Sequence, residues 1–402
     1  MSYFNQVGIQ GSDTFSIDAF GRWRISEPFT IFDSKTINDS GSLFWDVSGS
    51  GNFTSSFNTN GDYVQLSVSA SSVGRAIRQT KRRFNYQPGK SQLYLITGTL
   101  NSGSAGLTKM VGAFDDKNGL YYMLSGSSFY VGKRSYSTGV AVDTVVSQSA
   151  FNIDKMDGTG PSGINLNFAN SQIFYFDYEW LGVGRVRMGT VYRGVIYYMH
   201  QFTHSNESSG VYISSPNLPV RWEIKNDGTG PSDNIKAICC SVMSEGGVQP
   251  NGVARSVQVG PQTITTNTTA PIIGVRLNSN YLDLSVVMSD FSLIADAANR
   301  SFKWTWQVNP TLTGTPTWIS SSTDGVEYAT GSAALTFSSN GFIIDGTFVS
   351  LADSGIYNDF DGHTNGLRLG SKIDGTQDQM WLIATPISNN TNFYSSLTWN
   401  EL

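Results

Sequence analysis

The sequence is short of cysteine and of charge. Only two of its 402 residues are cysteines, Cys239 and Cys240, and charged residues make up 14%, against roughly 25% in an average globular domain. Adjacent cysteines rarely bridge each other, because the disulfide would strain the peptide between them. We therefore expect no disulfide framework, and folding in a reducing cytoplasm.

Long apolar runs are missing as well. No apolar stretch approaches the 18 or so residues of a membrane-spanning helix. The first residues, MSYFNQVGIQGS, lack the basic segment and apolar run of a secretion signal. We expect no contact with a membrane and no secretion. The net charge of −5 also argues against direct nucleic-acid binding, which requires a basic surface.

Turn formers and aromatic residues are abundant instead. The chain has 42 glycines and 12% aromatic residues, and runs of aromatic and β-branched residues separated by Gly and Asn are typical of strands and turns. We predict an all-β fold with an extended arm at 1–40, a β-sandwich (jelly-roll or concanavalin-like) at 41–258 and a smaller β domain at 259–402. Within the last domain, residues 284–298 are ambiguous between strand and short helix.

The longest β-rich run, residues 172–204, suggests a strand register. If it begins as a hairpin with a three-residue loop, Asp177 lies opposite Arg187 and Glu179 opposite Arg185, with apolar pairs on the other face. The alternative is one unbroken strand. A turn at Arg193-Gly194 follows, because glycine permits positive φ.

Two stretches carry predictions about burial. Residues 195–202 are apolar on both faces over their first half, which is typical of a strand beneath a stacked sheet. The basic cluster is predicted to be a solvated strand or loop edge, with an intersubunit contact or a nucleic-acid-facing patch as alternatives. This cluster contains Arg75, Arg78, Lys81, Arg82 and Arg83.

The sequence offers few residues for catalysis or metal binding. His200 and His204 are spaced i, i+4, but on a strand this places them roughly 13 Å apart. Asp177 and Glu179 share a strand face about 6.6–7 Å apart, wider than the roughly 5–5.5 Å of a retaining glycosidase pair. We predict a non-enzymatic protein with no catalytic residue, no metal site and no cofactor.

Two further patterns have a structural and a functional interpretation. The hexapeptide DGTGPS occurs at 157–162 and 227–232 and predicts tight turns, with a structural repeat or a metal site as alternatives. The aromatic residues of the C-terminal domain are predicted to form its core, with a sugar-stacking platform as the alternative. They are Trp304, Trp306, Trp318, Tyr328 and Trp381.

Residues 15–35 interleave aromatic, aliphatic and charged residues without a helical period. We predict that they form an arm that docks onto an assembly or a sister subunit. Its contact residues would be Phe20, Arg22, Trp23, Arg24, Phe29 and Phe32. We also expect a homo-oligomer, with a trimer favoured.

Four motifs resemble a family of structural proteins from the virions of tailed bacteriophages, which includes fibre, decoration and tail-associated components. They are SIDAFGRWRISEPFTIFDSK at 16–35, EWLGVGRVR at 179–187, LPVRWEI at 218–224 and SLTWNE at 396–401. The resemblance implies a subunit made in the host cytoplasm and incorporated into the virion, where it would contact other virion proteins and its own copies. We expect the N-terminal arm to anchor it to the capsid, neck or tail. The alternatives are a fibre module that binds a carbohydrate or host receptor, such as a host-surface glycan, and a polysaccharide-degrading enzyme using Asp177 and Glu179.

Overall fold

The computed structural model describes residues 27–247, 252–296, 300–320, 324–349, 355–359 and 368–402. In these ranges the chain forms antiparallel β-strands and one 3-10 turn, η3 (Gln148–Ala150). No helix in the described ranges is long and apolar enough to cross a membrane. The predicted all-β fold is therefore confirmed.

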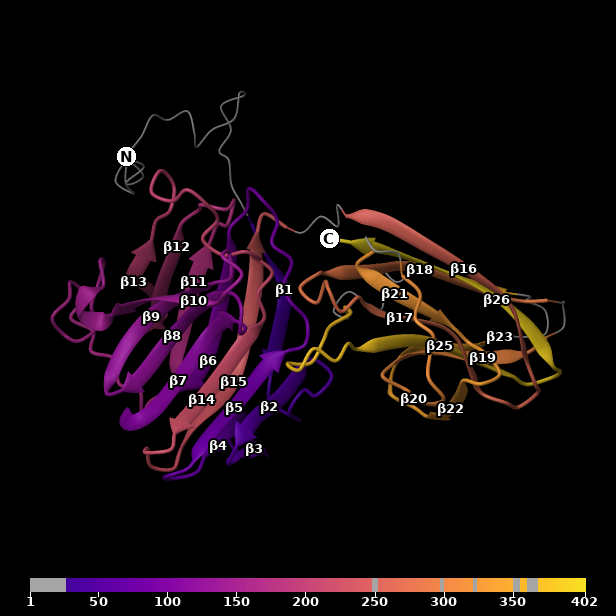
Figure 1. The fold of residues 1–402 in the computed structure, drawn as a ribbon, viewed down its shortest axis with the longest axis horizontal. Coiled ribbons are helices and arrows are strands. Elements are labelled where there is room, and N and C mark those ends of the chain that lie inside the picture. The colour runs from indigo at the N-terminus through magenta and orange to yellow at the C-terminus, as the bar shows by residue number, and fades with distance from the viewer. Residues whose placement is uncertain (1–26, 248–251, 297–299, 321–323, 350–354, 360–367) are drawn as a thin grey trace, which may run out of the picture.

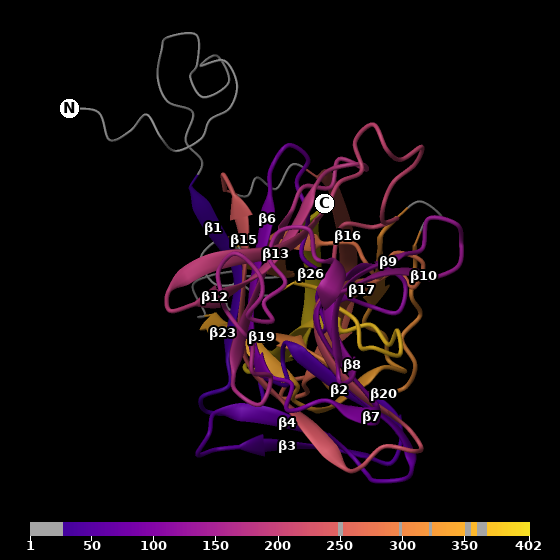
Figure 2. The same cartoon turned by 90° about the vertical axis from the view of Figure 1, so that its left-hand side faces the viewer.

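Two sheets pack face to face in the N-terminal part of the chain (Figures 1 and 2). The first runs β13 (Val195–Phe202), β12 (Val186–Tyr192), β11 (Gln172–Tyr178), β6 (Gln92–Thr99), β15 (Asp233–Glu245), β4 (Tyr63–Val68) and β3 (Phe53–Asn58), with β1 (Pro28–Lys35) beside β15. The second runs β10 (Val142–Ser147), β9 (Ser128–Ser135), β8 (Gly119–Gly126), β7 (Ser104–Phe114), β14 (Val220–Asp227), β5 (Val73–Thr80) and β2 (Trp45–Gly51).

Aromatic side chains fill the space between these sheets. Tyr94 stacks on Phe176 with ring centroids 4.8 Å apart, and Trp45 packs on Trp222 at 5.2 Å. Each fully buried ring contributes on the order of 1.5–3 kcal/mol before the cost of ordering is subtracted. The core thus fixes which faces of the two sheets point outward.

The predicted hairpin register is confirmed. Asp177 pairs with Arg187 across β11 and β12, and Glu179 N donates a hydrogen bond to Arg185 O at 3.0 Å. Arg193 (φ 51°) and Gly194 (φ 80°) form the turn into β13. The predicted burial of β13 is wrong, because this strand lies at the sheet edge and exposes its first residues to solvent.

The C-terminal domain is a second, smaller pair of sheets (right in Figure 1). One sheet runs β16 (Val253–Ile264), β26 (Thr391–Glu401), β18 (Val286–Ala295) and β24 (Gly355–Asp359). The other runs β21 (Val326–Thr330), β17 (Ala270–Leu277), β25 (Gln379–Pro386), β19 (Phe302–Val308) and β23 (Phe342–Val349), and β20 (Thr311–Thr313) pairs with β22 (Thr336–Ser339). The described part of the ambiguous stretch, residues 284–296, thus contains strand β18 and no helix.

The predicted aromatic core of this domain is present. Trp304, Trp306 and Trp381 are buried, so they cannot form the sugar-stacking platform considered as an alternative. Trp318 is only partly buried. Its ring packs against that of Trp381, and the guanidinium of Arg276 lies 4.3 Å from the Trp318 ring centroid.

The structure changes the predicted domain boundaries. β1 is part of the sandwich, since residues 28–35 pair with β15 and Phe32 packs 5.0 Å from Phe84 in the core. These residues are therefore not a separate arm. At the other boundary, β16 begins at Val253 and already pairs with β26 of the C-terminal domain, ahead of the predicted start at 259.

Three residues of the basic cluster, Arg78, Lys81 and Arg82, are buried, contrary to the prediction of a solvated edge, whereas Arg75 and Arg83 are partly exposed. Arg78 lies over Trp45 and Arg82 over Phe32, at 4.5 and 5.0 Å from the ring centroids. Lys81 reaches the C-terminal domain, where its Nζ lies 3.6 Å from Asp378. These side chains are buried by tertiary packing. Strand β5 lies between β14 and β2, and the residues that follow it run into the junction of the two domains.

Candidate functional site

The Asp177 carboxylate lies on the outer face of the first sheet, within a group of polar side chains. Arg187 Nε donates to Asp177 Oδ1 at 2.7 Å, and the Arg187 Nη2 group reaches Oδ2. The hydroxyls of Tyr175 and Tyr198 donate to the same Oδ2 at 2.8 and 3.2 Å. Gly189, between the two tyrosines in the sheet, has no side chain to separate their rings.

Beside this carboxylate is a hollow of about 380 Å³ where β6, β11, β12 and the end of β15 meet. Its lining comprises Gly89, Lys90, Ser91, Tyr175, Asp177, Arg187 and Glu245. Asp177 Oδ1 accepts one hydrogen bond, so a lone-pair direction is left. Lys90 Nζ donates to Gln87 Oε1 and to Gly247 O, which leaves one of its three protons.

The two histidines near this sheet edge are packed into the protein. His204 stacks on Tyr212 at 4.2 Å, while its Nδ1 pairs with Gly184 O at 2.6 Å and its Nε2 with Lys133 Nζ at 2.8 Å. Burial lowers the pKa of His204 and of His200. In the described residues no group of three or more His, Cys, Asp or Glu side chains could hold a metal.

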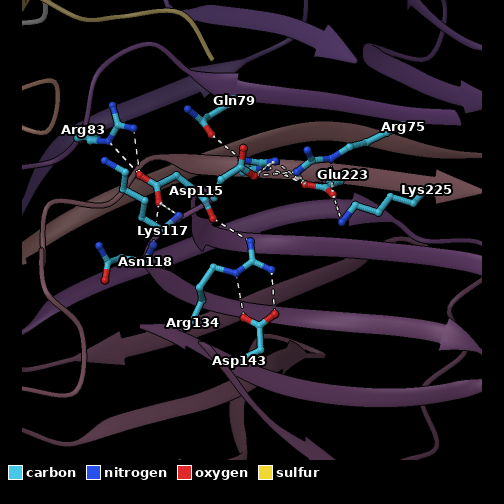
Figure 3. A network of polar contacts seen from close by, with 12 residues as sticks. Arg75, Gln79, Arg83, Asp115, Lys117, Asn118, Arg134, Asp143, Glu223 and Lys225 are labelled. Atoms are coloured by element: carbon cyan, nitrogen blue, oxygen red, sulfur yellow. Dashed lines mark hydrogen bonds and ion pairs between the residues drawn. The ribbon is translucent and has the colours of Figure 1, made fainter. Parts of the chain in front are cut away.

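A second polar layer covers the outer face of the other sheet (Figure 3). Its centre is Glu223, which is 1% exposed and accepts hydrogen bonds from Arg75 and Arg221 at 2.9 Å. Lys225 Nζ lies 2.9 Å from the same carboxylate. Asp116 bridges Arg75 and Arg221 from the loop after β7, at 2.8 and 2.9 Å.

The charges around Glu223 set its ionisation. Burial alone would raise the pKa of this carboxyl, but the charge of Arg221, the hydrogen bond from Arg75 and the charge of Lys225 outweigh burial and lower the pKa to about 2. The group is therefore a permanent anion at neutral pH. Its role in the layer is to hold three cations in fixed positions.

This second layer was not predicted as a site, although the sequence carries a signal for it. Residues 220–225, VRWEIK, alternate apolar and charged side chains, which places Arg221, Glu223 and Lys225 on one face of a strand. The partners of that face come from β5 and β7. No local pattern shows that those strands are neighbours.

The predicted arm contacts divide into three groups. Phe29 is 52% exposed on β1, whereas Phe32 is 7% exposed in the core and cannot serve as a docking contact. Phe20, Arg22, Trp23 and Arg24 lie outside the described residues.

The two DGTGPS hexapeptides form turns, as predicted. Asp157 Oδ1 accepts hydrogen bonds from the Thr159 amide and hydroxyl at 2.9 and 2.6 Å. Asp227 does the same with Thr229 at 2.9 and 2.7 Å. Both aspartates thus stabilise their own loops.

Comparison with known proteins finds likeness only in solved structures. No protein-family profile matches the chain, and neither does any curated protein. A legume lectin-like domain from Entamoeba histolytica has 10% identity and a TM-score of 0.33, covering 53% of this chain and 97% of its own. The Emp47p carbohydrate recognition domain has 10% identity and a TM-score of 0.34, covering 59% and 100%.

A glycosyl hydrolase family protein from Mycobacterium fortuitum is similar to the same extent. It has 10% identity and a TM-score of 0.36, covering 53% of this chain and 99% of its own. Likeness of this size indicates nothing about what the present chain binds, so function has to be argued from the site.

Proposed function

We propose that the chain is a non-enzymatic, glycan-binding subunit of a tailed-phage virion. The observation that carries the binding role is the hollow beside Asp177. It offers an acceptor at Asp177 Oδ1 and a donor at Lys90 Nζ. Sugars present hydroxyl donors and acceptors around an apolar ring, and concave sites with a few placed polar groups suit such ligands.

The positions and pairing of Asp177 and Glu179 favour binding over glycoside hydrolysis. A glycosidase needs two carboxyl groups that flank the same bond of the bound sugar. Asp177 is held by both arms of Arg187, and Glu179 is exposed beyond the end of β11. Glu179 is also absent from the lining of the hollow, so the two carboxylates are not arranged as an acid and a nucleophile around one ligand.

A glycan array with the purified full chain tests the proposal. We expect binding to a subset of neutral glycans, and a loss of at least about tenfold for Asp177→Asn, because a charge-assisted hydrogen bond contributes roughly 1.5–3 kcal/mol. Glu179→Gln removes a neighbouring exposed carboxylate outside the hollow and should bind as the wild type does.

A second variant separates loss of binding from loss of folding. Lys90→Gln changes a partly exposed lining residue and should weaken binding while the unfolding temperature stays unchanged. Absence of binding by the wild type, or equal binding by Asp177→Asn and wild type, would overturn the proposal.

The virion setting rests on the four motifs that resemble tailed-phage structural proteins, at 16–35, 179–187, 218–224 and 396–401. A purely structural role is therefore the second candidate, with the exposed Phe29 and residues 1–26 as its contacts. Deleting 1–26 leaves β1 in place and should give a folded protein that fails to enter particles. Normal incorporation would remove this candidate.

A further inference from the structure

Five side chains form a continuous row across the outer face of the second sheet. Ser50 pairs with Arg75, Arg75 with Lys225, Lys225 with Thr108, and Thr108 with Ser125. The row crosses β2, β5, β14, β7 and β8, and strands lie about 4.8 Å apart, so it extends over roughly 19 Å.

The same five residues line a hollow of about 370 Å³. Arg75 and Lys225 occupy its middle with side chains 29% and 41% exposed, and the three hydroxyls flank them. The carboxylate in this lining belongs to Asp227, which Thr229 holds in its turn.

Both cations keep donors that no described residue uses. Arg75 donates hydrogen bonds from Nε to Glu223 and from Nη2 to Glu223 and Asp116. The two protons of Nη1 remain. Lys225 Nζ pairs with Glu223, which leaves two of its three protons. Glu223 lies two residues before Lys225 on the same face of β14. It holds both cations in place and leaves these protons free to bind a ligand (Figure 3).

We infer that this row binds an acidic polysaccharide, with Arg75 and Lys225 receiving its carboxylate or sulfate groups and the flanking hydroxyls contacting its sugar hydroxyls. Pre-positioned cations bind such anions through charge-assisted hydrogen bonds, and a guanidinium matches them best. The inference rests on the proposed function in one respect, that the ligand is a carbohydrate. The site itself is separate, because the row lies on the opposite sheet from Asp177.

Binding of the full chain to immobilised polygalacturonate, dextran sulfate and neutral dextran tests the inference. We expect binding to an anionic polymer that weakens as NaCl is raised, and much weaker binding to dextran. Stronger binding to polygalacturonate identifies the carboxylate as the group recognised, and stronger binding to dextran sulfate identifies the sulfate.

Three variants locate the site. Lys225→Gln should weaken binding to the preferred anionic polymer about tenfold, whereas Lys155→Gln, at an exposed lysine elsewhere, should leave it unchanged. Lys225→Gln is judged on the anionic polymer and Asp177→Asn on the neutral-glycan array, so failure of the Asp177 hollow and failure of this row give different results. Equal binding to dextran, or no effect of Lys225→Gln, would overturn the inference.

Discussion

Asp177 of β11 and Arg187 of β12 lie directly opposite each other and form a two-armed ion pair on the outer face of the sandwich. Arg187 also covers the ring of Tyr198, with its guanidinium 4.7 Å from the ring centroid. One arginine thus neutralises a nearly buried carboxylate and packs on the neighbouring strand.

Removing Arg187 should therefore destabilise the protein. Arg187→Ala leaves the Asp177 charge without its cation, and we expect a loss of about 2 kcal/mol in the free energy of unfolding, less than for a fully buried pair because Arg187 is one-third exposed. Denaturant unfolding measures the loss. Arg193→Ala, in the exposed turn after β12, is the control, and an equal effect of both changes would contradict the assignment.

Glu223 should make stability depend on acid pH. Its pKa in the folded protein is about 2, below the ordinary 4.5, so its contribution is complete above about pH 4.5 and is lost as pH falls towards 2. Between pH 7 and pH 3 the loss should reach about 2 kcal/mol. Comparing Glu223→Gln with wild type by urea unfolding at both pH values measures it.

The control for this pH effect is Glu207→Gln, at an exposed carboxylate bonded to Thr203. Glu223→Gln should lose less stability on acidification than the wild type, whereas Glu207→Gln should follow the wild type. Parallel acid curves for all three proteins would show that Glu223 is not the anion described.

Two phenylalanines of β1 test whether this strand belongs to the body. Phe32→Ala should cost about 3–5 kcal/mol, because it opens a cavity among Phe44, Trp45 and Phe84. Phe29→Ala, on an exposed side chain, should change stability by less than about 0.5 kcal/mol. Thermal unfolding of both variants measures the difference. Equal, small effects would show that β1 belongs to the predicted arm and not to the sandwich.

The sequence predicts the fold best where strands pair with their neighbours in the chain. The register of Asp177 against Arg187 follows from charge and apolar matching within one hairpin. β1 and the basic cluster around Arg78 were mispredicted because their burial depends on β15 and β14, more than a hundred residues away. Strand β18 is ambiguous in sequence because a bulge between Met288 and Asp290 interrupts its alternation of buried and exposed residues.

The same distinction applies to the sites. The pairing of Asp177 with Arg187 can be predicted from their opposite charges. The hollow beside them also needs Lys90, just before β6, and Glu245, at the end of β15. The row through Arg75 and Lys225 combines five strands. Its composition follows from sheet order, which no local pattern specifies.

The most direct test of glycan binding is a crystal structure of the full chain with a glycan that the array identifies. We predict electron density for a sugar in the hollow lined by Lys90, Asp177 and Arg187, with a ring hydroxyl within hydrogen-bond distance of Asp177 Oδ1. A sugar bound elsewhere while this hollow holds only solvent would contradict the central claim.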